Sequence, residues 1–264
     1  MTSTVHAVLA ERRHQRILSV LRSGGPASVA ELSEQLGVSP ATVRRDLVRL
    51  EEDGLLTRVH GGAVVEEGDQ PFAEVAEVRV DEKDAIAARA AAMITDGQSV
   101  LLDIGTTAYR LARHLHGRRL TVITSNLVVY EELADDEDIA LVLLGGMVRR
   151  EYRSLVGFLT EDNLRQLHAD WLFLGTSGIR PGGQVMDTTV VEVPVKRAMI
   201  AASDRVVLLA DAAKFPGTGM AKVCGPEDLD AVVTDAPVDP ATRSALQEAG
   251  VEVVVADDRG RVQR

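Results

Sequence analysis

The sequence predicts an α/β protein made of two domains, an N-terminal winged helix-turn-helix and a larger domain built on a mostly parallel β-sheet. Over residues 27–63, two short helical periods joined by a tight turn precede an alternating stretch that contains a Gly-Gly pair. From residue 99 onward, continuous apolar runs alternate with helical stretches, which is typical of a parallel sheet covered on both faces. We place the two domains at residues 10–65 and 81–257, with a linker at 66–80.

The first helix of the helix-turn-helix is predicted from Leu32 and Leu36, which lie four residues apart and therefore share one face. Gly37 supplies the left-handed backbone that ends this helix. Ser39 before Pro40 is a typical N-cap followed by a first-turn proline. A tight turn between two helices is therefore expected at this point.

The second helix is predicted to have one buried face and one basic face. Val43, Leu47 and Leu50 recur at positions i, i+4 and i+7 and form the buried stripe. In a winged helix-turn-helix the second helix enters the major groove of DNA, and the wing contacts the phosphates or the minor groove. The predicted DNA-binding residues are Ser39, Thr42, Arg44, Arg45, Arg49, Arg58, His60, Gly61 and Gly62.

Two other interpretations of this region are a helical domain with a merely solvated arginine face and a winged helix that binds protein. The agreement of turn glycine, cap, periodicity and wing favours DNA. An earlier helix, expected from Glu11 to Leu21, carries Arg12, Arg13 and Arg16, which either approach the DNA backbone or face solvent. Because one such module covers only a half-site, we expect a homo-oligomer, a dimer or tetramer, on double-stranded operator DNA.

The formal net charge of −11 is divided unequally between the two parts of the chain. Residues 1–65 hold 8 Arg against 7 acids, which gives +1, and residues 66–264 hold 21 basic residues against 33 acids, which gives −12. The acidity lies outside the helix-turn-helix, where it discourages indiscriminate binding to DNA. DNA binding should therefore depend on a few local arginines and weaken with salt.

Several classes of protein are not expected. The single cysteine, Cys224, excludes an intrachain disulfide framework and a CxxC metal site. The six histidines lack HxH and HExxH spacing, so no metal is predicted. GxGxxG, Walker and GxSxG motifs are absent, and we expect no cofactor and no catalytic residues. The sequence contains neither a membrane-length apolar run nor a signal-peptide core, which predicts a cytoplasmic protein without membrane association.

The larger domain is predicted to contain seven apolar strands and at least six helices. The strands are expected at 99–103, 120–124, 139–144, 171–175, 205–211, 229–235 and 251–257. The helices are expected at 81–94, 107–115, 127–134, 161–167, 192–202 and 240–249. Ligands of such sheets bind beyond the carboxyl ends of the strands.

Two strand-to-helix turns carry the polar groups of a candidate ligand site. One strand ends in Asp103 and continues into a Gly105-Thr106-Thr107 turn, whose hydroxyls and helix N-terminus suit an anion. The next strand ends in Ser125 and Asn126. Each turn taken alone is equally explained as a helix cap. Together, on successive strands, they favour a phosphate-bearing ligand.

Two lysines near predicted strand ends receive different interpretations. Lys214 follows a strand that ends at Asp211, where its ammonium could reach a phosphate or hydroxyl. Lys196 stands four residues after Glu192, which is the spacing of an ordinary surface ion pair on a helix. We therefore assign Lys214, and not Lys196, to the candidate site.

The chain resembles the DeoR family of bacterial transcriptional regulators over about residues 11–257. The N-terminal signature is ELSEQLGVSPATVRRDLVRLEEDGLLTRVHGGA. The second half matches in family order at DIGTT, ITSN, LGGMVRREYRSLVG, WLFLGTSGI, VEVPVKRAMI and LADAAKF. The sequence departs from the family in its linker, where FAEVAEVR delays the expected arginine to Arg79.

The resemblance implies a regulator, most often a repressor, of carbohydrate-catabolism genes. It also implies a C-terminal domain similar to ribose-5-phosphate isomerase that senses a phosphorylated sugar. The effector-binding residues carried over are Asp103, Gly105, Thr106, Thr107, Ser125, Asn126 and Lys214, with Arg149 and Glu192 as weaker candidates. The alternative is a sugar-phosphate isomerase or deaminase with a DNA-binding head, for which Asp187 or Glu192 could supply the base; no closely spaced acid pair in the sequence marks such a site.

Overall fold

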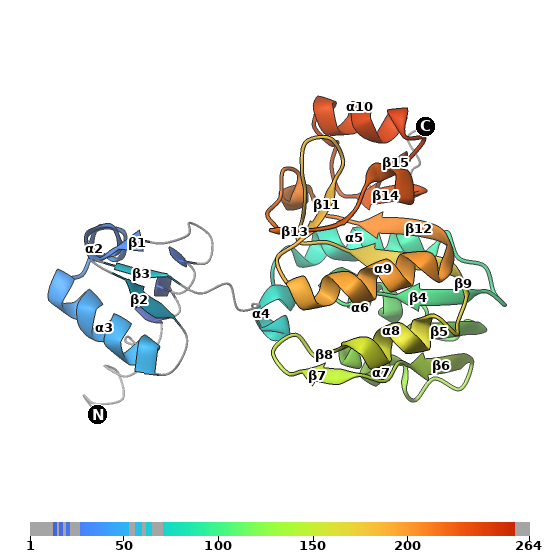
Figure 1. Ribbon diagram of the computed structural model, residues 1–264, viewed down its shortest axis with the longest axis horizontal. Helices are drawn as coiled ribbons and strands as arrows, with labels where there is room; N and C mark the ends of the chain where they lie inside the picture. The colour runs from blue at the N-terminus through green and yellow to red at the C-terminus, as the bar shows by residue number, and fades with distance from the viewer. Residues whose placement is uncertain are drawn as a thin grey trace. The chain divides into compact units, whose positions relative to one another are not determined.

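The protein consists of two compact units, residues 1–68 and 69–264, which are described separately here (Figure 1). In this computed structural model the described residues are 13, 14, 16, 17, 20, 21, 27–52, 56–59, 62–64 and 71–256. None of the helices in these ranges is both long and apolar enough to cross a membrane.

The N-terminal unit combines helices with a small antiparallel sheet. Its described elements are β1 (Ala27–Ser28), α2 (Val29–Leu36), α3 (Pro40–Glu52), β2 (Thr57–Val59) and β3 (Gly62–Val64), and the strand order is β1-β3-β2. Of the first expected helix, the described residues 13, 14, 16, 17, 20 and 21 are helical. The core contains Ile17, Leu21, Val29, Leu32, Val43, Leu47, Leu50, Leu56 and Ala63.

The predicted turn between the two helices is confirmed in its details. Gly37 ends α2 with φ +65°, in the left-handed region. The Ser39 hydroxyl accepts a hydrogen bond from the Thr42 N–H at 3.2 Å, as an N-cap does. At the start of α2, Ser28 and Glu31 form a capping box. These local bonds fix where α3 begins and so how its exposed face is presented.

The C-terminal unit is organised around a seven-stranded parallel sheet. Its strands are β4 (Ser99–Leu102), β5 (Leu120–Thr124), β6 (Ile139–Leu143), β9 (Ala169–Gly175), β12 (Ser203–Leu209), β14 (Ala231–Thr234) and β15 (Glu252–Val255). The spatial order is β15-β14-β12-β9-β4-β5-β6, and every neighbouring pair is parallel. The seven strands are those predicted from the apolar runs.

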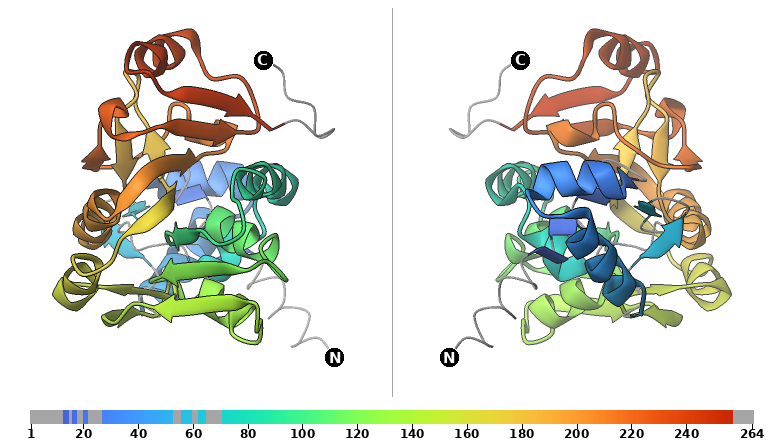
Figure 2. Two further views of the ribbon diagram at one scale, coloured as in Figure 1. Left: turned by 90° about the vertical axis from the view of Figure 1, so that its right-hand side faces the viewer. Right: turned by 90° about the vertical axis from the view of Figure 1, so that its left-hand side faces the viewer.

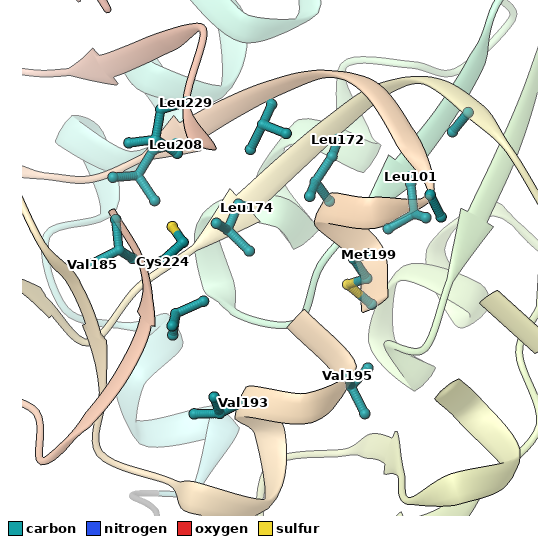
Figure 3. Packing of buried hydrophobic residues seen from close by; sticks show 14 of the residues in the cluster. Leu101, Leu172, Leu174, Val185, Val193, Val195, Met199, Leu208, Cys224 and Leu229 are labelled. Carbon is teal, nitrogen blue, oxygen red and sulfur yellow. The ribbon is translucent and has the colours of Figure 1, made fainter. Parts of the chain in front are cut away.

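Helices cover both faces of this sheet, as Figures 1 and 2 show. On one face are α5 (Val80–Ala91), α6 (Thr106–Arg113) and α7 (Leu127–Leu133); on the other are α8 (Phe158–Leu164), α9 (Val193–Ala201) and α10 (Pro240–Glu248). Successive strand residues divide between two cores because strand side chains alternate. Leu101 packs on the α9 face (Figure 3), and Leu102 packs on the α5 face.

The order of the strands reverses between β4 and β9. From β4 the chain runs through β5 to β6 on one side, then returns to place β9 against the other side of β4. Parallel sheets bind ligands at such a switch point, outside the carboxyl ends of the two strands. The sheet topology therefore directs attention to the residues that follow β4 and β9.

Two small sheets and several short helices were not predicted. They are β7 (Met147–Arg149) with β8 (Ser154–Val156), and β10 (Gly178–Ile179) with β11 (Val185–Asp187) and β13 (Ala221–Cys224), together with the 3₁₀ turns η1 (Val190–Glu192), η2 (Ala212–Lys214) and η3 (Pro226–Asp228). The predicted linker at 66–80 also differs from the structure, because it contains the helix α4 (Phe72–Ala76). Phe72 is buried, so this part of the predicted linker is packed structure within the C-terminal unit.

Candidate functional sites

The outward face of α3 is basic. Arg44, Arg45 and Arg49 are all exposed, while Val43, Leu47 and Leu50 on the opposite face are buried. Within the described ranges, none of these three arginines has a carboxylate within ion-pair distance. Ser39 is exposed and Thr42 half-buried at the start of the helix. The arrangement presents three cations on one helix face, which is what phosphate and guanine recognition requires.

A partly buried ion pair holds α3 against the first helix. Asp46 is only 6% exposed and accepts hydrogen bonds from Arg13 Nη2 at 2.9 Å and His14 Nε2 at 3.0 Å. Burial alone would raise the pKa of Asp46, but the bonds from Arg13 and His14 outweigh it and hold that pKa below its usual value. A DNA-backbone contact was one of the two predictions for Arg13 and Arg16. Arg13 instead pairs with Asp46 inside the N-terminal unit, whereas Arg16 is exposed.

The wing is described in part. The pairing of β2 with β3 places Val59 opposite Gly62 and Arg58 opposite Ala63. His60, Gly61 and the Arg58 side chain, all predicted DNA contacts, lie outside what the structure describes. Gly62 has a structural reason to be glycine, since a Cβ there would stand 2.2 Å from the Ala27 carbonyl oxygen.

At the switch point of the large sheet, two aspartates surround a buried lysine. Asp103 follows β4 and is fully buried; its Oδ2 accepts from the Gly175 N–H at 2.8 Å and pairs with Lys196 Nζ. The Lys196 ammonium also lies 3.6 Å from Asp187 Oδ2. Burial lowers the pKa of Lys196, but the two carboxylates outweigh it and keep the pKa above its usual value.

The interpretation of Lys196 as a surface partner of Glu192 is wrong. Glu192 belongs to a 3₁₀ turn that precedes α9, and Lys196 points into the sheet, where it is 2% exposed. The sequence has no closely spaced acid pair, but the structure brings Asp103 and Asp187 together in space, where they share the Lys196 ammonium. Sequence spacing did not reveal this group, since its members are far apart along the chain.

No side chain caps the N-terminus of α6, which follows directly on the end of β4. Gly105 precedes the helix with φ +112°, a conformation that side chains disfavour. Thr106 is buried and Thr107 half-buried in the first turn. The Tyr152 hydroxyl lies 3.8 Å from where a Cβ on Gly105 would stand. Unbonded N–H groups, two threonines and a phenol therefore meet at the carboxyl end of β4.

Ser125 and Asn126, at the end of β5, are both fully buried. The Asn126 Oδ1 accepts from the Val128 and Val129 N–H groups at 3.0 and 3.4 Å and caps α7. The helix-cap interpretation therefore holds for Asn126, although it does not hold for the turn before α6. Among the described residues, no partner exists for Asn126 Nδ2 or Ser125 Oγ.

Arg149 and Glu192 join the β7–β8 hairpin to η1. The Arg149 guanidinium pairs with Glu192 Oε1, which also accepts from Ser154 Oγ at 2.8 Å. Ser154 forms a β-bridge with Asn126, so this group adjoins the end of β5. Burial lowers the pKa of Arg149, and the arginine carbon Cζ lies 5.9 Å from the centre of the Tyr152 ring.

Lys214 lies half-buried in η2, next to a cluster of other cations. The pKa of nearby Lys83 is lowered to about 8, mainly by burial. The positive charges of Lys214, Arg110 and Arg79 lower this pKa further, whereas the negative charge of Asp211 raises it. Within the described ranges, Lys214 has no carboxylate at ion-pair distance. Its ammonium thus remains available to an anion, and the structure does not place it in the Asp103 group.

Sequence reasoning considered Asp187 only as the base of the alternative enzyme and set Lys196 aside as a surface residue. It did not assign Tyr152, Ser154 or Lys83 to the effector site. Around the carboxyl ends of β4 and β5, three buried polar groups besides Asn126 Nδ2 have no hydrogen-bond partner among the described residues: Asp103 Oδ1, Ser125 Oγ and Glu192 Oε2. Buried polar groups in native proteins are nearly always bonded to protein or ordered water, so such a concentration marks this end of the sheet as a candidate site. The described residues contain no group of three His, Cys, Asp or Glu side chains able to hold a metal ion.

The winged helix-turn-helix and the parallel sheet with polar groups at its switch point define a class of two-unit DNA-binding regulators. The chain belongs to the DeoR family of transcriptional regulators. The family profile described as the DeoR-like helix-turn-helix domain matches residues 13–68, and the DeoR C terminal sensor domain matches residues 78–236.

Similar proteins with curated names are regulators. The HTH-type transcriptional regulator GolR of Listeria innocua is 34% identical over 249 residues, covering 93% of this chain and 98% of that protein. The glycerol-3-phosphate regulon repressor of Escherichia coli is 36% identical over 229 residues, covering 86% and 91%. The transcriptional repressor GlcR of Bacillus subtilis is 33% identical over 255 residues, covering 95% and 98%.

Solved structures with related folds are distant. Ribose 5-phosphate isomerase A from Methanocaldococcus jannaschii matches with a TM-score of 0.38 and 17% identity, over 51% of this chain and 54% of that chain. The tetrameric eIF2B-beta2-delta2 complex from C. thermophilum matches with a TM-score of 0.47 and 15% identity, over 91% and 88%.

Proposed function

We propose that this chain is a transcriptional repressor of carbohydrate-catabolism genes, controlled by a phosphorylated sugar in its C-terminal domain. It binds double-stranded operator DNA as a homo-oligomer, with the exposed arginines of α3 in the major groove. The observation that carries the effector proposal is the uncapped start of α6 beside buried polar groups that lack partners among the described residues. The printed name of one relative, a glycerol-3-phosphate regulon repressor, supports a small phosphorylated ligand.

The two halves of such a ligand match the two kinds of group at the site. A phosphate accepts hydrogen bonds from the first-turn N–H groups of α6 and from Thr106 and Thr107, with Lys214 as a nearby cation. Sugar hydroxyls both donate and accept, so they can bond to Asp103 Oδ1 and Ser125 Oγ. A free sugar satisfies only the second set, and inorganic phosphate only the first.

The test is thermal unfolding of the full chain with phosphorylated sugars, their unphosphorylated forms and inorganic phosphate. A ligand at 100 times its Kd adds about 2.7 kcal/mol of stability, which raises Tm by about 5–10 °C for a domain of this size. We expect a shift with a phosphosugar that its free sugar does not give. Thr106→Ala should reduce the shift, and Ser244→Ala on distant α10 should leave it unchanged. The absence of any shift across the panel would contradict the proposed effector class.

A second candidate function is sugar-phosphate isomerisation, which the Asp103–Lys196–Asp187 group favours because such chemistry needs a carboxylate base positioned beside the ligand. We propose binding without turnover, in keeping with relatives named as regulators. The same phosphosugars are incubated with the protein and analysed for isomerised or deaminated product. Product that forms with the wild type and disappears with Asp187→Asn would identify an enzyme.

A further inference from the structure

The first helix after the wing, α4, packs against residues that adjoin the candidate effector site. Phe72 is 6% exposed, and its ring meets two tyrosines edge-on, with centroids 5.9 Å from Tyr109 and 6.0 Å from Tyr152. Tyr109 lies in α6, whose N-terminus is the proposed phosphate site, and the Tyr152 hydroxyl reaches Gly105 at that same N-terminus. The Phe72 ring therefore contacts one residue of the site, Tyr152, and one residue of the helix that begins there, Tyr109.

Hydrogen bonds hold both ends of α4. The Phe72 N–H donates to the Glu151 carbonyl at 2.9 Å. At the other end, Lys83 Nζ donates to the Val75 carbonyl at 2.7 Å and Arg110 Nη2 to the Ala76 carbonyl at 3.3 Å. Five residues are too few for a helix to be stable by itself, so these contacts determine whether α4 is formed.

The turn between β7 and β8 connects the site to α4. Its residue Tyr152 adjoins the site, and the preceding residue, Glu151, bonds to α4. Tyr152 packs beside the Arg149 guanidinium and faces Gly105, while the adjacent Glu151 carbonyl holds the Phe72 N–H. Arg153 closes this turn with φ +53°, in the left-handed region that non-glycine residues rarely adopt. A turn restrained in this way cannot shift Tyr152 without also moving the Glu151 carbonyl.

We propose that this turn and α4 form the connection through which an occupied effector site acts on the DNA-binding unit. The inference rests on the proposed function and specifies its regulation. A phosphosugar bonded to the Tyr152 hydroxyl fixes the turn, and the fixed turn holds the Phe72 amide and ring. In sequence, only residues 65–71 separate α4 from β3, the last strand of the wing, so docking of α4 sets the length of chain that connects the two units.

The first test separates coupling from binding in the full chain. The variant is Phe72→Leu, which keeps α4 apolar but removes both ring contacts; the matched control is Val78→Ala, an exposed apolar residue of the same segment. Glycerol 3-phosphate, ribose 5-phosphate and glucose 6-phosphate serve as probes, and the operator is selected from random duplexes. Probe Kd is measured by calorimetry, and operator Kd is measured with and without saturating probe.

We expect Phe72→Leu to bind the active probe within about threefold of wild type. The change in operator affinity caused by that probe, typically about 5- to 150-fold, should fall below about twofold, while Val78→Ala keeps the wild-type change. A full change in Phe72→Leu would overturn the inference and leave the proposed function standing. Failure of every probe to bind the wild type would overturn both.

The second test follows α4 directly. Hydrogen exchange is measured for peptides that cover residues 69–79 of the full chain, with and without the active probe. Exchange of the Phe72–Ala76 amides should slow by about fivefold or more, because opening of α4 becomes rarer when the turn is fixed. In Tyr152→Phe, which lacks the hydroxyl, the slowing should disappear. Exchange that the probe does not alter in wild type would refute the role of α4.

Discussion

Replacing Ser125 with alanine should raise stability and weaken effector binding together. Ser125 is fully buried, and its Oγ has no partner among the described residues. Burial of an unbonded polar group costs about 1–3 kcal/mol, so its removal should increase the free energy of unfolding by up to that amount. Each kilocalorie raises Tm by about 2–4 °C in a domain of this size. If a sugar hydroxyl bonds to Oγ, its loss costs about 0.5–1.5 kcal/mol, or about 2- to 13-fold in Kd.

Ser154→Ala is the matched control for this substitution. Ser154 is equally buried, but its hydroxyl donates to Glu192 Oε1 at 2.8 Å, so its loss should destabilise the protein by about 1–2 kcal/mol. Both variants are compared with wild type by urea unfolding and by phosphosugar titration. Equal destabilisation by the two substitutions would mean that Ser125 is bonded after all. A more stable Ser125→Ala with unchanged phosphosugar affinity would show that its hydroxyl does not contact the ligand.

Three further predictions concern other parts of the chain. Replacing Arg44 and Arg45 with alanine should abolish operator binding in gel-shift assays while the circular dichroism spectrum stays unchanged, because both side chains are exposed; retained affinity would contradict the assigned recognition face. The pKa of Asp46 is lower in the folded protein than in the unfolded chain. The ionised carboxylate therefore stabilises the fold at pH values above the pKa of the unfolded chain, and this stabilisation is lost as the pH falls through the pKa of the folded protein. Asp46→Asn should therefore unfold the N-terminal unit about 1–3 kcal/mol more easily at pH 7, and the difference should shrink in acid titrations below about pH 4. Burial raises the pKa of Cys224 to about 12, so native protein should resist iodoacetamide at pH 8, and mass spectrometry should detect alkylation only after denaturation.

Much of the fold was predictable because it follows from local regularities. The buried stripe of Val43, Leu47 and Leu50 is a helical period, and the seven sheet strands are apolar runs bounded by polar turns. The short strands β7 and β10 have no such period and were missed. The helix α4 was assigned to a linker because five residues beside Pro and Gly carry no helical signal; it is a helix because of Phe72 and the bonds at its two ends.

The candidate site was predictable where the sequence itself brings groups together. Asp103 and the Gly105-Thr106-Thr107 turn are neighbours in the chain, so their grouping needed no tertiary information. Lys196 is 93 positions from Asp103, and the spacing to Glu192 suggested a solvated pair instead. Only the sheet order, which places β9 beside β4, brings α9 and its lysine over the end of β4. Sequence periodicity contains no information about such a contact.

The position of Lys196 in the chain determines when the Asp103–Lys196 ion pair can form during synthesis. A chain emerging from the ribosome offers β4, β5 and β6 first, and these strands can pair while the rest is still being synthesised. Asp103 is then present without its counterion, because the pairing of β4 with β9 and the arrival of α9 both come later. A nascent regulator therefore has no complete site until well over two thirds of its length has been translated. Asp103 therefore gains its counterion only once α9 has brought Lys196 over the end of β4.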